Sequence, residues 1–195
     1  AYHQPAAVLA DTTTLATLPP EEHAAGYAEV VKTALIAGGP LWERVGAGGP
    51  VDESVIFGCA RTKLAVVAED ERDGGRRQVL NLGHTVGHAL ETVLGYGTLR
   101  HGEAVGLGLL CALRLSGQDA LRAQVSDLLA EHGLPVTLAG HEADQDAIDA
   151  AIARDKKRAG DGPTPFVLVH APGDVRHGCA VDPADLRAAM AELRA

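Results

Sequence analysis

Three histidines between residues 81 and 103 form the part of the sequence best suited to chemistry. His84 and His88 are four residues apart, so on a helix both imidazoles lie on one face. His101 follows a Gly-Tyr-Gly turn, which can bring it back over that face. Neutral imidazole is the commonest protein metal ligand, and catalytic zinc typically has three protein ligands and one open position. The pattern predicts a divalent metal site whose third ligand can be a carboxylate from elsewhere.

The spacing of His84 and His88 also has an ordinary interpretation. Two histidines at helical spacing often share a face on the surface or in the core of a protein that binds no metal. The segment is not a metalloprotease motif either, since Thr85 stands where H-E-x-x-H requires its glutamate. The histidines alone therefore leave both a metal site and an ordinary helix face open.

Several uncommon strings occur together along the chain. The longest is N-L-G-H-T-V-G-H-A-L-E over residues 81–91, followed by H-G-E-A-V-G over 101–106. The others are L-P at 18–19, G-Y-A-E-V-V-K at 26–32, K-L-A-V-V at 63–67, D-E at 70–71 and D-K-K at 155–157. Together they cover most of the chain, and they resemble, in the same order, the C-terminal metal-binding domain of the 3-dehydroquinate synthases, members of the sugar phosphate cyclases.

Glu29 and Lys32 lie three residues apart and share one face of a predicted helix. A solvated surface ion pair is the ordinary interpretation of that spacing. The neighbouring alanine and valines, however, make the helix apolar around both charges. The resemblance implies that Glu29 completes a site for Zn²⁺ or Co²⁺ with His84 and His101, and that Lys32 reaches into the substrate pocket.

The resemblance implies further substrate contacts at Lys63, Arg77, Asn81, His88 and Lys157. Lys63 lies close to an apolar stripe, where lysines commonly bury the stem and keep the ammonium in water. His88 is implied to be a polar pocket group that assists proton movement or holds phosphate, and not a metal ligand.

The arginine and lysine assignments each involve a choice between neighbours. Family members usually have an apolar residue where Arg76 stands, so Arg77 is the better candidate, and its planar guanidinium suits a carboxylate. Asn81 follows one helical turn after Arg77 and is expected on the same face. Lys156 and Lys157 end a helix, where basic residues ordinarily complement the helix dipole. Lys157 is preferred to Lys156 as the substrate contact.

The family's fold and reaction are what the resemblance implies for the whole protein. Residues 1–18 would be the last strand and linker of an N-terminal nucleotide-binding domain, and residues 19–195 the helical metal- and substrate-binding domain. The reaction is that of a carbon–oxygen lyase of the shikimate pathway to aromatic amino acids. It converts 3-deoxy-arabino-heptulosonate 7-phosphate into 3-dehydroquinate with NAD bound through the N-terminal domain. We expect a homodimeric full-length enzyme, and neither NAD binding nor turnover from these 195 residues alone.

Three alternatives keep part of this pattern. Another sugar phosphate cyclase, of the amino-dehydroquinate or deoxy-scyllo-inosose synthase type, would keep the metal ligands and differ in the pocket. A metal-dependent alcohol dehydrogenase would keep metal and NAD without needing Lys32, Lys63 and Arg77 to gather an anionic substrate. A non-catalytic helical module would bind no divalent metal.

The elements needed to position these residues are mainly helices. Alanine and leucine abound and only 3% of residues are aromatic, which favours packed helices over a β-sandwich. The predicted helices cover residues 19–37, 51–68, 76 onward through the histidines, 102–116, 121–132, 144–158 and 183–193. A short strand is predicted at 6–10 and a β-hairpin at 166–169 and 175–181. Glycines at 102, 106 and 108 predict close approach of neighbouring helices and not a phosphate loop.

Charge and cysteine content restrict the partners. The net charge of −9 argues against nucleic acid and acidic membranes as partners, since both require a basic surface. A phosphorylated sugar acid would then need a local positive cluster, so we expect most of the predicted contacts to point into one cavity with the three metal ligands. The three cysteines form no C-x-x-C pair, and no signal peptide or membrane span is evident. These features predict a cytoplasmic protein without disulfides.

Overall fold

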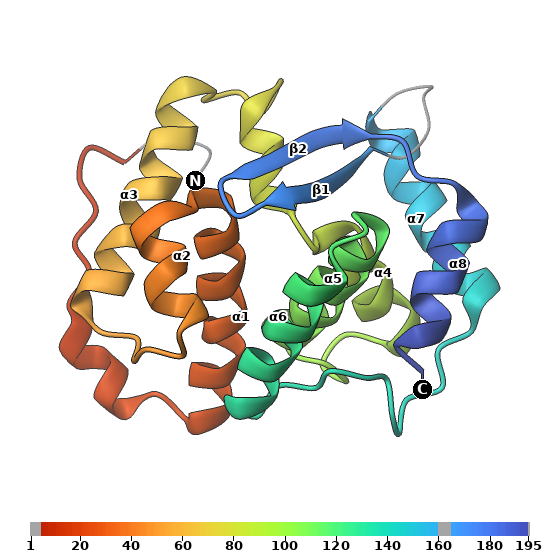
Figure 1. Ribbon diagram of the computed structural model, residues 1–195, viewed down its shortest axis with the longest axis horizontal. Helices are drawn as coiled ribbons and strands as arrows, with labels where there is room; N and C mark the ends of the chain where they lie inside the picture. Colours follow the sequence, from red (N-terminus) through yellow and green to blue (C-terminus); the bar gives the residue numbers. More distant parts are fainter. Residues whose placement is uncertain (1–4, 160–164, 195) are drawn as a thin grey trace.

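The computed structural model describes residues 5–159 and 165–194, with the backbone alone for residues 155–159. Figure 1 shows a helical protein with one small β-hairpin. The elements in chain order are η1 (Thr12–Thr17), α1 (Pro20–Ala37), α2 (Gly39–Gly46), α3 (Glu53–Glu69), η2 (Arg76–Asn81), α4 (His84–Leu94), α5 (His101–Leu115), α6 (Asp119–Glu131), α7 (Gln145–Ala159), β1 (Phe166–Ala171), β2 (Asp174–Cys179) and α8 (Pro183–Glu192). The predicted fold class, mainly α with a hairpin near the C-terminus, is confirmed.

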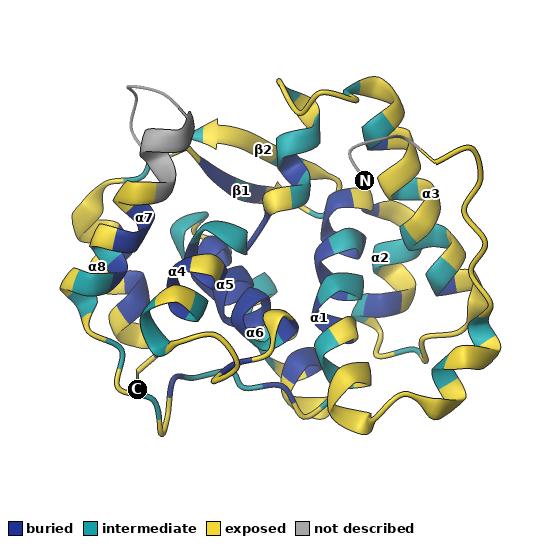
Figure 2. Cartoon of the chain, turned by 180° about the vertical axis from the view of Figure 1, so that it is seen from behind, coloured by how far each residue is buried: buried dark blue, intermediate teal, exposed yellow. Residues whose placement is uncertain are grey.

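Helix α5 lies at the centre of the fold. All of its residues from Ala104 to Leu113 are buried, and α1, α4, α6, α8 and β1 pack around it. Figures 1 and 2 show α1, α2 and α3 on one side of this centre and α7 and α8 on the other. In the described part of the chain, no helix combines the length and hydrophobicity that a membrane span requires. The first residue of α5, His101, is thereby placed between α1 and α4.

Two glycines let α5 approach its neighbours closely, as the sequence predicted. A Cβ atom on Gly108 would lie 1.9 Å from the carbonyl oxygen of Gly83, and one on Gly102 would lie 2.0 Å from that of Ala25. Neither distance is sterically possible, so any side chain would push the helices apart. These contacts join the helices that carry the candidate ligands.

Replacing Gly108 with alanine is expected to destabilise the protein by about 3 kcal/mol, because the new methyl group must displace the backbone at Gly83. Urea unfolding followed by circular dichroism measures this change. Gly26→Ala on α1 is the matched control, since nothing lies within 4 Å of its Cβ position and alanine favours a helix. Equal stability of the Gly108→Ala variant and the wild type would contradict the close-packing argument.

The hairpin covers the ends of α1 and α5. Strands β1 and β2 are antiparallel with Val169 opposite Val175, and β1 is largely buried while β2 is largely exposed. The Gly173 amide at the turn donates to the Leu35 carbonyl of α1 at 2.8 Å. The Val169 amide donates to the Ser116 hydroxyl at the end of α5 at 3.0 Å. The hairpin therefore holds the two helices at their C-terminal ends.

The strand predicted at residues 6–10 is wrong for this chain. These residues have no regular secondary structure, and the side chains of Val8 and Leu9 are 74% and 97% exposed. A strand forms only where a neighbour accepts its hydrogen bonds, and the described residues place none beside this segment. The proposed domain boundary at residue 18 stays a prediction.

Two helix boundaries also differ from the prediction. The Gly-Gly-Pro sequence that ends α1 also begins α2, since Pro40 occupies the first turn, where its missing amide hydrogen is not needed. The histidine helix does not begin at Arg76, because Gly83 adopts a left-handed conformation (φ 78°) between η2 and α4. Arg77 and Asn81 are in a 3₁₀ segment, where residues three apart align, so they do not share a face as predicted.

Candidate metal centre

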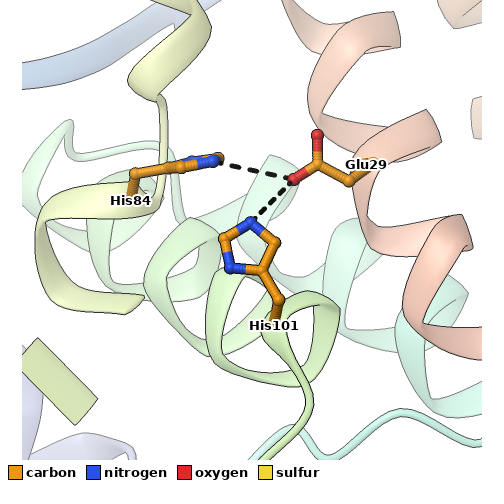
Figure 3. Close-up of side chains that lie close together, drawn as sticks. All are labelled: Glu29, His84 and His101. Carbon is orange, nitrogen blue, oxygen red and sulfur yellow. Dashed lines mark ion pairs between the residues drawn. The ribbon is translucent and has the colours of Figure 1, made fainter. Parts of the chain in front are cut away.

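The three candidate ligands come from three different helices. Glu29 is in the middle of α1, while His84 and His101 are the first residues of α4 and α5. The Gly83 break sets the direction of α4, and the Glu103 side chain accepts the Arg100 amide at 2.7 Å to cap α5. Figure 3 shows the three side chains pointing toward one another.

One carboxylate oxygen lies between the two imidazoles. Glu29 Oε1 is 3.7 Å from His84 Nε2 and 3.6 Å from His101 Nε2. This oxygen is buried and has no hydrogen-bond partner among the described residues. A buried acceptor without a partner costs free energy, which a cation at this position would recover. One carboxylate and two imidazoles are a typical ligand set for Zn²⁺ or Co²⁺, so the residues fit a divalent metal.

The second nitrogen of each imidazole fixes how the ring faces this oxygen. His84 Nδ1 lies 3.1 Å from the Leu82 carbonyl, and His101 Nδ1 lies 3.2 Å from Glu91 Oε1. Both oxygens can only accept, so Nδ1 donates and the lone pair of the neutral ring is on Nε2. Both rings thus present Nε2 to Glu29 as ligands would.

Lys32 dominates the charge near Glu29. Its Nζ donates to Glu29 Oε2 at 2.6 Å, and Lys32 is the one charged residue buried in the described part of the chain, at 6% exposure. Burial opposes ionisation of Glu29, but the charge and hydrogen bond of Lys32, with smaller contributions from the two histidines, leave its pKa below 4.5. Burial, with the nearby Lys32 charge, lowers the pKa of His84 to about 4. At neutral pH the carboxylate is charged and His84 is neutral, as ligands must be.

Acidification from pH 6.5 is expected to destabilise the metal-free protein, and His84→Gln should remove much of that effect. The His84 pKa is 6.5 unfolded and about 4 folded, so between these values the unfolded chain binds more protons. Stability is therefore full above pH 6.5 and falls as the pH approaches about 4. Glu29, whose pKa is lowered from 4.5 in the folded protein, adds a further loss of stability only below pH 4.5.

Urea unfolding with chelator at a series of pH values measures this dependence. His177→Gln, which removes an exposed histidine on β2, is the control and should keep the wild-type slope. An unchanged slope in His84→Gln would show that His84 is not the group responsible.

His88 lies beside the three ligands but outside their group. Its ring centroid is 5.3 Å from that of His84 and 5.9 Å from that of His101, and its side chain is exposed. It lines a pocket of about 530 Å³ with Glu91 and Arg154. His88, Glu91 and His101 also have nitrogen and oxygen atoms close enough to bind a cation. The role of His88 as a pocket group therefore stays a prediction.

The structure does not join the remaining candidates to the ligands. Lys63 is exposed on α3, and Arg77 Nη1 donates to the Glu71 carbonyl at 2.7 Å. Asn81 is exposed at the end of η2, and the Lys157 side chain lies outside the described residues. No hydrogen bond or ion pair in residues 5–154 connects Lys63 or Arg77 to Glu29, Lys32, His84 or His101. Their convergence on one cavity stays a prediction, although α1, α3 and η2 pack against one another.

Sequence reasoning gave no role to Glu91, which contacts His101, or to Arg100, which holds the start of α5. Glu91 accepts from His101, and its position seven residues after His84 on the same helix was a signal that it shares that face. Arg100 Nε donates to Glu22 Oε1 at 2.9 Å, which ties the start of α5 to the start of α1. The sequence contained no comparable signal for this contact, because the two residues are far apart in the chain.

Comparisons of the sequence agree with one family. The 3-dehydroquinate synthase C-terminal family matches residues 26–158. A 3-dehydroquinate synthase from Caulobacter vibrioides is 42% identical over 98% of this chain and 56% of its own length. One from Rhodospirillum rubrum is 44% identical over 100% of this chain and 54% of its own length. The chain thus spans little more than half the length of these curated relatives.

Two solved structures share the fold. A 2-epi-5-epi-valiolone synthase from Streptomyces hygroscopicus, with NAD⁺ and Zn²⁺ bound, has a TM-score of 0.79 and 23% identity, covering 94% of this chain and 54% of that one. A 2-deoxy-scyllo-inosose synthase complexed with carbaglucose-6-phosphate, NAD⁺ and Co²⁺ has a TM-score of 0.78 and 24% identity, covering 93% and 55%. At these identities the likeness concerns the fold alone.

Proposed function

The chain belongs to the 3-dehydroquinate synthase C-terminal family, and from that membership we propose that it is the metal- and substrate-binding domain of a 3-dehydroquinate synthase. The reaction proposed is the NAD-dependent conversion of 3-deoxy-arabino-heptulosonate 7-phosphate into 3-dehydroquinate with loss of phosphate. Because the chain spans about half of its relatives, we assign the NAD site to the part of those proteins that it does not cover.

The observation that carries the proposal is the buried oxygen of Glu29. It has no hydrogen-bond partner among the described residues, and the Nε2 atoms of His84 and His101 face it within 3.7 Å. We propose that Glu29, His84 and His101 hold Zn²⁺ or Co²⁺. The valiolone and inosose synthases of the same fold contain these two ions with NAD⁺, which supports the choice. Such an ion, when bound, polarises a substrate hydroxyl or carbonyl oxygen.

The chain's own residues would supply positioning and proton transfer. Lys32, which is cationic and buried against Glu29, would hold an anionic or hydroxyl group of the substrate beside the ligands. His88, which lines the pocket of about 530 Å³ with Glu91 and Arg154, would accept or deliver a proton or hold phosphate. Lys63, Arg77, Asn81 and Lys157 are the further proposed contacts. Together these groups would form the local positive cluster that a protein with a net charge of −9 needs to bind an anionic substrate.

Metal analysis of the purified chain, before and after chelation, tests this proposal. We expect about one Zn²⁺ or Co²⁺ per chain, lost on chelation and restored on adding either ion. We expect no NAD binding and no turnover from the chain alone. A chain that binds no divalent metal would contradict the proposal. Turnover assays of the full-length enzyme, proposed to be a homodimer, would separate a dehydroquinate synthase from another sugar phosphate cyclase by its substrate.

A further inference from the structure

The two candidate histidine ligands differ in how firmly the fold holds them. The His84 side chain is 15% exposed, and its Nδ1 donates to the Leu82 backbone carbonyl at 3.1 Å. The His101 side chain is 48% exposed, so packing leaves much of its ring free. Its Nδ1 faces Glu91 Oε1 at 3.2 Å. The contact with Glu91 therefore holds the His101 ring in place, as burial and a backbone carbonyl hold the ring of His84.

We propose that Glu91 is a positioning residue that holds His101 as a metal ligand, an inference that rests on the metal site of the proposed function. A carboxylate that accepts from Nδ1 keeps the proton on that nitrogen and the lone pair on Nε2. That Nε2 is the atom 3.6 Å from Glu29 Oε1. The negative charge also makes the imidazole a stronger electron donor to a cation.

The surroundings of Glu91 agree with this role. Its side chain is 14% exposed, on the helix that also carries His84, and its one hydrogen bond within the described residues is to His101. A carboxylate this far from solvent needs a partner, and no arginine or lysine of the described part forms an ion pair with it. The site thus contains a chain of contacts from Glu91 through His101 to Glu29.

A direct ligand role for Glu91 is the competing interpretation, because Glu91, His88 and His101 could also surround a cation. In that arrangement His101 would bind the cation through Nδ1. Its Nε2 atom, which faces Glu29, would then not be a ligand. The buried oxygen without a partner belongs to Glu29, whereas His88 in the competing group is exposed. The geometry therefore favours Glu91 as a hydrogen-bond acceptor outside the ligand set.

Cobalt titration of the purified protein against a competing chelator, with the visible absorption spectrum of the bound Co²⁺, tests the inference. Glu91→Leu should weaken Co²⁺ binding about 10- to 100-fold and shift the spectrum, because His101 loses its fixed orientation. Glu91→Gln keeps an oxygen that can accept from Nδ1, so its affinity for Co²⁺ should fall clearly less than that of Glu91→Leu. Glu43→Gln removes a charge from an exposed glutamate on α2 and should match the wild type. Circular dichroism confirms that each variant is folded.

The outcomes separate this inference from the proposed function. Wild-type affinity and an unchanged spectrum in folded Glu91→Leu would overturn the positioning role while leaving the metal site intact. A loss in Glu91→Gln as large as that in Glu29→Gln would also overturn it, since it would make Glu91 a ligand. Failure of the wild-type protein itself to bind Co²⁺ would contradict the proposed function.

Discussion

His84→Ala and His101→Ala are each expected to weaken Zn²⁺ or Co²⁺ binding by more than about 100-fold, whereas His88→Ala should change it only a few-fold. Loss of an outer hydrogen-bond partner typically costs about 10- to 100-fold, so loss of one of three ligands must cost more. His84 Nε2 and His101 Nε2 both face the unpaired Glu29 oxygen, and His88 does not belong to that group.

Competition with a chelating dye measures the three affinities under one set of conditions. His177→Ala removes an exposed histidine on β2 and serves as the control. Equal losses from His84, His88 and His101 would show that the division between ligands and pocket residue is wrong. A small loss from His84→Ala with a large one from His88→Ala would move the metal to the group that contains Glu91.

The sequence predicted most helices because their signals are local. Helical periodicity, Gly-Pro boundaries and the glycine-dotted segment of α5 located six helices and the hairpin within a few residues. The break at Gly83 was missed because a glycine inside a helical pattern is compatible with both a continuous helix and a break. The strand at residues 6–10 was wrong because periodicity indicates that a segment can pair, and not that a partner is present.

The candidate ligands could be predicted from the sequence only in part. The spacing of His84 and His88 placed both rings on one helix, but it could not decide which of them faces Glu29. That choice came from the family resemblance. His84 Nε2 and His101 Nε2 lie 3.7 and 3.6 Å from Glu29 Oε1, while their role as ligands stays a prediction. The contact of Glu91 with His101 depends on how the turn between α4 and α5 folds, which no local pattern specifies. For Lys63 and Arg77, the motif shared with the family did not by itself show where the side chains lie.

Lys32→Ala is expected to abolish turnover of the full-length enzyme while leaving its metal content intact. Lys32 is 6% exposed and its ammonium lies 2.6 Å from Glu29 Oε2, in direct contact with one of the proposed ligands. A positioned cation or proton donor in a site that excludes water typically contributes about 10²- to 10⁴-fold to the rate. Its removal should not release the metal, because a cation beside Glu29 competes with the ion for the carboxylate. Metal affinity should therefore be unchanged or slightly higher.

Parallel measurement of kcat/KM, metal content and thermal unfolding distinguishes this role from a structural one. Arg61→Ala removes one positive charge from an exposed position on α3 and should leave all three quantities near their wild-type values. If Lys32 had only a structural role, its replacement would lower activity only together with stability or metal content, because the loss of activity would result from a change in the fold. Turnover near the wild-type rate in Lys32→Ala, or a loss of metal that parallels the loss of activity, would remove Lys32 from the substrate site. A metal-loaded, folded and inactive variant would instead place the buried ammonium against the substrate.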